Sequence, residues 1–365
     1  MKYVKLAAAL CLAAGLLLFP ETVLNAVREA MYAWYSTAAP SLFPFMVLMP
    51  MITCREACAL YERLLGKAMG FLTGLPGAAA PVLIIAMTAG SPAGALAAVR
   101  CGLGREDAER LLGCVCGLSP AFLISGIGAG MLGNPIYGRK LLQIQLSAQL
   151  VMLALTRFHR AGTQRRASLP PENPDCIRPA VGNILAVGGY MIFFSVIAAL
   201  IARILNSAAV GTAVLCLLDV PAGARAVSAL TINMEEKMTI LAAMTGLGGV
   251  CIAVQNLSAA KETGARAWAV ALMRGANAVL CALFAKTGVF EGKFTIFNFT
   301  PKTAFSTLIA AFLLIPACFS LRNTSFLNKR IFAKICRKNR EKRKNPQDVV
   351  DNVDNSGQHL VIQKN

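Results

Sequence analysis

The dominant pattern along the chain is a series of long apolar runs that contain few charged residues. A helix that spans a membrane needs about 17–25 residues of this kind. A soluble core could account for one such run but not for a series of them, so the pattern predicts an all-α polytopic membrane protein. The runs are Val4–Leu18, Leu111–Leu132, Leu141–Thr156, Ile184–Ile204, Met238–Leu257, Trp268–Ala285 and Phe305–Leu321.

An eighth, less regular apolar segment lies near Met31–Thr53. Two further apolar stretches are interrupted too soon to span twice, given a helical rise of about 1.5 Å per residue. Their breaks are Ser91-Pro92 and Asp219-Val220-Pro221. Non-helical backbone at membrane depth is tolerated only where it is buried in protein or lines a watery cavity. We therefore expect about eight transmembrane helices plus two re-entrant hairpins with these breaks at their tips.

The two expected hairpins belong to an internal repeat. A shift of 129 positions places Pro92–Ala95 on Pro221–Ala224, and the matches continue to Gly117-Leu118 on Gly246-Leu247, with nine identities in all. Three expected spans separate the hairpins, and an odd number puts the hairpins on opposite faces of the membrane. Inverted repeats with broken helices are typical of secondary transporters, whose substrate sites lie near the midplane.

The repeat and the polar segments divide the chain into five expected parts. When the basic C-terminal tail is placed in the cytoplasm, most loop Arg and Lys residues also fall inside, as the positive-inside rule requires; Arg28 and Arg139-Lys140 are exceptions. The parts are an N-terminal membrane anchor helix and connector (1–38), a first repeat (39–160), a cytoplasmic linker (161–183), a second inverted repeat with the final helices (184–321) and a basic, partly disordered cytoplasmic tail (322–365).

Composition and charge narrow the function classes. The chain is 56% hydrophobic and 15% charged, with a net charge of +18. Because the basic residues gather in loops and in the tail, we expect contact with membrane lipids and not with nucleic acid. Most cysteines lie in apolar runs, where they act as small hydrophobes, and His159 and His359 lie in polar stretches. We expect no metal, no cofactor and no catalytic residues, and hence not an enzyme.

Four breaks in the apolar segments are candidates for a binding site. They are Thr88–Pro92, Gly117–Pro120, Asp219–Pro221 and Gly246–Gly249, the last followed by Gln255-Asn256. The N–H groups at the start of a half-helix favour an anion; alternatively, Gly and Pro merely kink packed helices. The expected substrate-binding residues are Ser91, Pro92, Ser119, Asp219, Arg225, Gly248, Gln255, Asn256 and Arg274.

Ionisable residues at membrane depth are costly and often functional. Asp219 could take a proton or bind a coupling cation, or it could simply cap a short helix. Arg225 and Arg274 could each pair with a carboxylate of the transported solute. For Arg274, pairing with a structural acid is the alternative.

Four motifs carry a resemblance to a known family: Ser41–Phe45, Gly90–Gly94, Leu118–Phe122 and Gly188–Ser195. In this order they resemble the sporulation integral membrane protein YlbJ family, also called SpoVV. That family carries a nucleoside-recognition or gate domain, distantly similar to concentrative nucleoside transporters, so the two repeats would be gate-type repeats. The resemblance implies an endospore-forming bacterium and the movement of dipicolinic acid, a small planar dicarboxylate, from the mother cell toward the forespore.

Together these observations predict an integral membrane transporter of a small anionic metabolite, with dipicolinic acid as the substrate that the resemblance implies. A nucleoside or other small-metabolite carrier and a non-transporting sporulation scaffold are the alternatives. We expect a multi-pass protein of the cell membrane, with the outer forespore membrane as one location. The sequence leaves homo-oligomerisation open.

Overall fold

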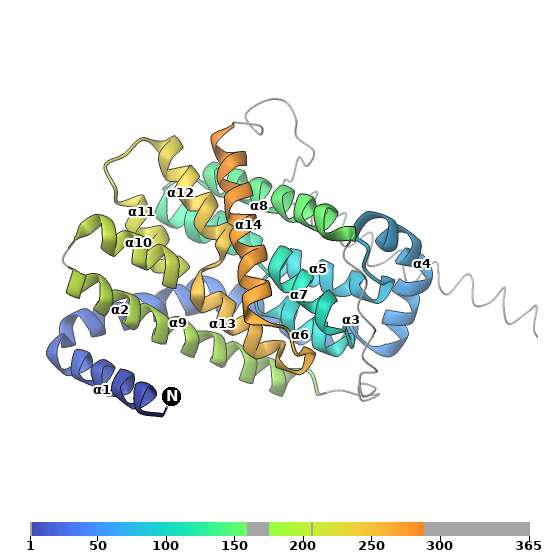
Figure 1. Ribbon diagram of the computed structural model, residues 1–365, viewed down its shortest axis with the longest axis horizontal. Coiled ribbons are helices and arrows are strands. Elements are labelled where there is room, and N and C mark those ends of the chain that lie inside the picture. Colours follow the sequence, from blue (N-terminus) through green and yellow to red (C-terminus); the bar gives the residue numbers. More distant parts are fainter. Residues whose placement is uncertain (1, 159–174, 206, 288–365) are drawn as a thin grey trace, which may run out of the picture. The chain divides into compact units, whose positions relative to one another are not determined.

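A computed structural model describes residues 2–158, 175–205 and 207–287, and all of its elements in these ranges are helices (Figure 1). Four helical stretches are long and apolar enough to cross a membrane: Pro20–Ile52, Ile177–Leu205, Met234–Ala259 and Ala267–Lys286. Counting a pair that is bent by 90° as one span raises the number to five. The all-α polytopic class is therefore confirmed, whereas the number of eight spans is not. The expected run Phe305–Leu321 and the tail lie outside the described residues.

The first half of the chain begins with α1, continues with one long helical stretch, Pro20–Ile52, and then forms a series of shorter helices. Pro20–Ile52 is continuous because α2, the π-helical η1 and α3 follow each other without a gap. The elements are α1 (Lys2–Leu18), α2 (Pro20–Ala33), η1 (Trp34–Ala38), α3 (Ala39–Ile52), α4 (Arg55–Thr73), η2 (Gly77–Ala79), α5 (Ala80–Thr88), α6 (Ala93–Arg100), α7 (Arg105–Cys114), η3 (Phe122–Met131), α8 (Pro135–Leu155) and η4 (Thr156–Phe158).

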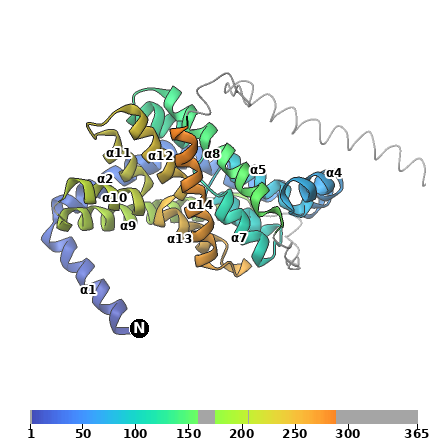
Figure 2. The same cartoon turned by 45° about the horizontal axis from the view of Figure 1, so that its top comes forward.

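The second half begins with the longest single helix and then repeats the same kind of series. α9 packs along α2 and α3, which joins the start of the chain to the second half (Figures 1 and 2). The elements are α9 (Ile177–Leu205), α10 (Ala208–Leu218), α11 (Val220–Ser228), α12 (Met234–Leu247), α13 (Gly249–Ala259), η5 (Lys261–Thr263) and α14 (Ala267–Lys286).

Helix α4 corrects one expectation. By the positive-inside pattern, the sequence predicts a cytoplasmic loop at 54–67, with Arg55, Arg63 and Lys67, followed by Lys67–Met87 as the first arm of the hairpin. The structure instead has one helix through both, because its apolar positions recur at helical spacing and bury Tyr61, Met69 and Thr73. Gly74, at φ +67°, ends the helix, and the chain then turns by 90°. The first arm of the hairpin is therefore only η2 and α5.

Both expected hairpins are present as helix pairs. α5 packs on α6 around the tip at Ser91-Pro92, and α10 packs on α11 around Asp219. At the first tip Gly90 has φ +80°, and a Cβ there would lie 2.7 Å from the backbone nitrogen of Ser119. Glycine is therefore required both by the left-handed backbone and by the close approach of another segment.

The two halves interlock in the described part of the chain, which belongs to one compact unit. The order α5, α6, α7, η3, α8 in the first repeat corresponds to α10, α11, α12, α13, α14 in the second. One apolar core joins η3 and α8 with α11 and α12. In addition, Glu109 of α7 accepts two hydrogen bonds of 2.8 Å from the guanidinium of Arg266, directly before α14, and this raises the pKa of Arg266.

Candidate functional site

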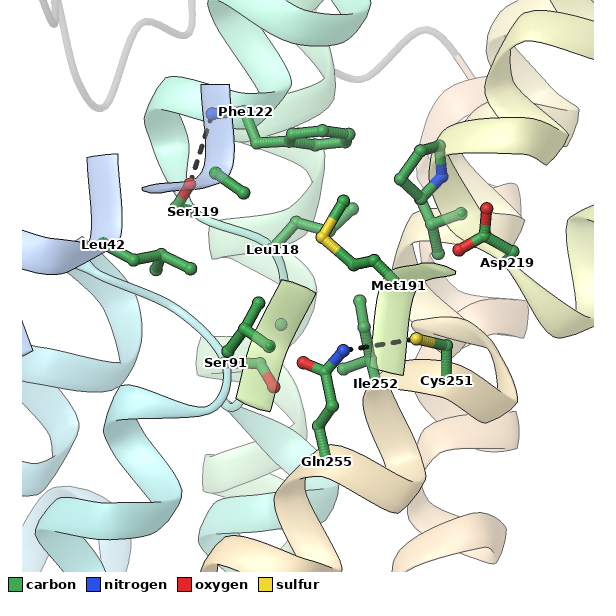
Figure 3. Close-up of a pocket in the computed structure, with 15 residues that line it drawn as sticks. Leu42, Ser91, Leu118, Ser119, Phe122, Met191, Asp219, Cys251, Ile252 and Gln255 are labelled. Carbon is green, nitrogen blue, oxygen red and sulfur yellow. Dashed lines mark hydrogen bonds between the residues drawn. The ribbon is translucent and has the colours of Figure 1, made fainter. Parts of the chain in front are cut away.

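Three of the four breaks, Thr88–Pro92, Gly117–Pro120 and Asp219–Pro221, meet at one pocket (Figure 3), and the helix that follows the fourth break borders it. The free space within it is about 60 Å³, less than the roughly 300–1,000 Å³ of a formed small-molecule site, so the pocket has to widen to admit a solute. These three breaks contribute to the wall, α13 contributes three residues that follow the fourth break, and the remaining wall comes from η1, α3, η3 and α9. The lining residues are Ala38, Leu42, Ser91, Gly117, Leu118, Ser119, Phe122, Val187, Met191, Asp219, Val220, Pro221, Cys251, Ile252 and Gln255.

A helix begins at the pocket after every break. α6 follows the Ser91-Pro92 tip, η3 follows Ser119, α11 follows Asp219, and α13 follows the glycine break. The first N–H groups of a helix have no partner within it, and that end carries a partial positive charge. Ser119 Oγ accepts a hydrogen bond from the backbone of Phe122 at 3.2 Å, whereas no side chain caps α6 or α13. The pocket therefore collects four electropositive helix ends.

Side chains from α8 donate hydrogen bonds to backbone carbonyls at the first mid-span break, Gly117–Pro120. Gln145 Nε2 donates to the carbonyl of Leu118 at 3.0 Å, and Gln149 Nε2 donates to that of Val115 at 2.9 Å. Both glutamines are buried. An unpaired buried carbonyl would be costly, so these two side chains stabilise an interrupted helix in the middle of the protein.

Two side chains of α14, called the clamp below, bind the backbone of the second mid-span break, Gly246–Gly249, in the same way. Arg274 Nη1 and Asn277 Nδ2, both on α14, donate to the carbonyl of Gly246 at 3.3 and 3.1 Å. Arg274 lies 129 positions after Gln145, the offset of the internal repeat. It is 3% exposed and does not line the pocket. The structure therefore shows Arg274 bound to backbone and not at the position expected for a residue that pairs with the solute.

A hydrogen-bond bridge ties the first tip to both mid-span breaks. Ser91 Oγ donates to Asn256 Oδ1 at 2.5 Å, and Asn256 Nδ2 donates to the carbonyl of Cys116 at 3.3 Å. The backbone N–H of Ser91 also donates to Gly117 O at 2.8 Å. Asn256 thus holds the tip from behind the pocket wall, where it is 1% exposed.

Asp219 is the one side chain with a full charge among the described residues that line the pocket. It is 2% exposed. One carboxylate oxygen caps α11 by accepting from the backbone N–H of Ala222 at 3.2 Å. The other oxygen, Oδ1, is buried and has no hydrogen-bond partner in the structure. The helix-cap alternative is therefore correct for half of this carboxylate and leaves the other half unexplained.

Of the remaining predicted residues, Ser91, Ser119 and Gln255 line the pocket. Pro92 lies buried at the tip next to Ser91, outside the lining. Gly248, at φ +81°, separates α12 from α13, also without lining it.

Arg225 lies away from the pocket. It forms an ion pair of 3.0 Å with Glu29 of α2, beside a second, more open cavity between α2, α9, α10 and α11. Arg225 was expected to pair with a carboxylate of the solute, but the carboxylate that the structure gives it belongs to the protein.

Several residues of this site were missed from the sequence. Gln145 and Gln149 are polar and one helical turn apart in an apolar run, and Asn277 follows Arg274 by three positions. Residues at these spacings share one helix face, so a search for polar pairs on one face would have found them. The apolar wall from α9 has no such signal.

Comparison with known proteins supports the resemblance seen in the motifs. The sporulation integral membrane protein YlbJ of Bacillus subtilis (strain 168) is 24% identical to the chain over 324 residues, which covers 75% of this chain and 79% of the relative. The chain is similar to YlbJ over three quarters of its length. No family model matches it, and no solved structure does. The likeness to YlbJ and the long apolar helices together place the chain in a membrane.

Proposed function

We propose that the chain is a membrane carrier that moves a small anionic metabolite through the pocket, with dipicolinic acid as its leading substrate. The supporting observation is the convergence of four half-helix N-termini on one cavity. Each helix N-terminus acts as roughly half a positive charge. A site built from such helix ends favours an anion without a basic side chain.

The chemistry of the wall suits a planar dicarboxylate. Leu118, Met191 and Ile252 offer apolar surface on which an aromatic ring can lie. Ser119 and Gln255 add polar groups at the wall. A ring held by apolar contacts and oriented by a few polar groups is the usual composition of a small-molecule site. The identity of the substrate comes from the family resemblance, and the mixture of apolar and polar groups in the wall supports it.

A nucleoside or other small metabolite is the second candidate. Asp219 favours it, because a carboxylate in the wall accepts hydrogen bonds from hydroxyl or amino groups of a neutral solute. A non-transporting scaffold is less well supported, because its centre would be packed and dry. A catalytic role has no support, since Ser91 and Ser119 bond to an amide and to backbone.

We also propose a location in the outer forespore membrane, with the basic tail in the cytoplasm. The name of the relative connects that protein with sporulation. A carrier in this membrane would move a solute made in the mother cell into the space next to the forespore. Impermeant labelling of a tag added after Asn365 tests the orientation, in mother cells whose plasma membrane is permeabilised while the forespore membranes stay closed. The tag should be labelled if the tail lies in the mother-cell cytoplasm.

Exchange of labelled dipicolinate in proteoliposomes, with unlabelled dipicolinate on the other side, tests the proposed function. Wild type should exchange the label. Ser91→Leu should abolish exchange while the protein stays folded in the membrane, because leucine fills the pocket and removes the bridge to Asn256. Ser36→Leu is the matched control, since Ser36 is exposed and outside the pocket lining. Unchanged exchange in Ser91→Leu would contradict a route through this pocket.

A further inference from the structure

The pocket combines two features that oppose each other. Four helix N-termini make it attractive to an anion, yet the carboxyl group of Asp219 lies in its wall (Figure 3). None of the fifteen described residues that line it is Lys, Arg or His. An ionised Asp219 would therefore repel the anion that the helix ends attract, and no basic side chain in the wall offsets that repulsion.

The elements around Asp219 offer little compensation for its charge. On α11 the nearest cation is Arg225, whose guanidinium is already paired with Glu29 of α2. α13 contributes the thiol of Cys251, and α10 contributes that of Cys216. The charged residues of α9 are near its ends, at 178 and 203, and those of α12 are in its first turn, at 235–237.

The second carboxylate oxygen is the group that can respond. Oδ1 of Asp219 is buried and has no hydrogen-bond partner in the structure, and the residue as a whole is 2% exposed. A proton on Oδ1 removes the negative charge and leaves an O–H donor, while Oδ2 continues to cap α11. A carboxyl group in a low-dielectric site is neutralised in this way rather than left charged and unpaired.

We propose that Asp219 takes up one proton when the pocket takes up an anion, so that the protein is a proton–anion symporter. This inference depends on the proposed function. The proton adds to Oδ1 from the side to which the pocket is open and leaves from Oδ1 after the anion departs on the other side. Binding linkage is reciprocal: if the proton strengthens anion binding, the anion strengthens proton binding by the same factor.

Gradient-driven uptake in proteoliposomes separates this inference from the proposed function. Wild type should accumulate labelled dipicolinate when the outside is acidic. With one proton per solute and no membrane potential, a gradient of one pH unit corresponds to about a tenfold accumulation. A protonophore should abolish the accumulation. A sodium gradient at equal pH is the second arm, and accumulation driven by sodium alone would overturn the choice of the proton.

Asp219→Asn imitates the protonated carboxyl group in shape and charge. Its accumulation under a pH gradient, measured relative to its own exchange rate in the same vesicles, should fall to the level seen without a gradient. Asp219→Glu should retain part of the coupling, and Glu236→Gln, an exposed acid at the start of α12, should behave as wild type.

Each outcome decides between the two proposals. If wild type exchanges dipicolinate but ignores the pH gradient, or if Asp219→Asn accumulates as well as wild type, the symport inference is wrong and the carrier stands. If wild type exchanges no dipicolinate at all, the proposed function fails and the inference fails with it.

Discussion

The two repeats are built alike but carry different charges at equivalent places. In the first, the tip residue Gly90 and the clamp residue Gln145 are neutral; in the second, 129 positions later, Asp219 is at the tip and Arg274 is at the clamp. Ser91 is bonded to α13 and to the first break, whereas every hydrogen bond that the structure shows for Asp219 stays within α10 and α11. The comparison suggests that the first repeat holds the site in place and that the second repeat supplies its response to charge.

The largest effect is expected at the first tip. Gly90 and Gly248 have almost the same φ, +80° and +81°, but a Cβ on Gly90 would lie 2.7 Å from backbone, while one on Gly248 would lie 3.5 Å from a side chain. Alanine in the left-handed region costs about 1–2 kcal/mol at either site. Gly90→Ala should therefore lower the Tm in detergent clearly more than Gly248→Ala does. Equal losses would mean that the first tip is not packed as tightly as described.

The next largest effect is expected at the clamp of the second break. Arg274→Ala removes one of two donors from the carbonyl of Gly246 and should cost about 1–3 kcal/mol. Arg274→Gln, which copies the first repeat, should recover part of the loss of stability and of transport. If Arg274 instead binds the solute directly, Arg274→Gln should be as inactive as Arg274→Ala while being as stable as wild type.

A moderate effect is expected for the bridge behind the pocket. Ser91→Ala and Asn256→Ala each remove one partner of the same hydrogen bond. A double-mutant cycle should give a coupling of about 0.5–1.5 kcal/mol in unfolding free energy. The equivalent cycle between Asp219→Asn and Asn256→Ala should give no coupling, and a measurable one would show that the second tip is also tied to α13.

The smallest effect is expected for the ion pair beside the second cavity. The side chains of Arg225 and Glu29 are 29% and 59% exposed, and ion pairs of this kind contribute about 0–1 kcal/mol. Arg225→Gln should leave the Tm and dipicolinate exchange close to wild type. A large loss of exchange with unchanged stability would return Arg225 to the substrate-binding residues.

The sequence predicted the parts of the fold that glycine, proline and the internal repeat mark. These residues interrupt helices wherever they occur, so the breaks at Ser91-Pro92, Asp219 and Gly248 could be located without a structure. The repeat then related the hairpins to each other. The same signals predicted four residues that line the pocket.

Long-range contacts could not be predicted in this way. The pairing of Arg225 with Glu29 joins positions almost two hundred residues apart, and a buried arginine gives no sign of whether it contacts solute or backbone. Helix α4 was missed because its charged residues suggested a loop, although their spacing leaves one apolar face. The pocket wall from α9 consists of apolar residues. Such residues also occur on a helix that only packs against its neighbours, so they give no sign of a pocket.

The central claim is that both tips face one solute-accessible pocket. Ser91→Cys and Asp219→Cys, each treated with a membrane-impermeant thiol reagent, test it, with mass spectrometry to separate the new thiol from native ones. Glu236→Cys is the control, since Glu236 is exposed in the first turn of α12 and lies outside the pocket lining. We predict that both tip thiols react and that dipicolinate slows both reactions but not that of Glu236→Cys. Tip thiols that stay unreactive, or that react at a rate independent of dipicolinate, would contradict the account.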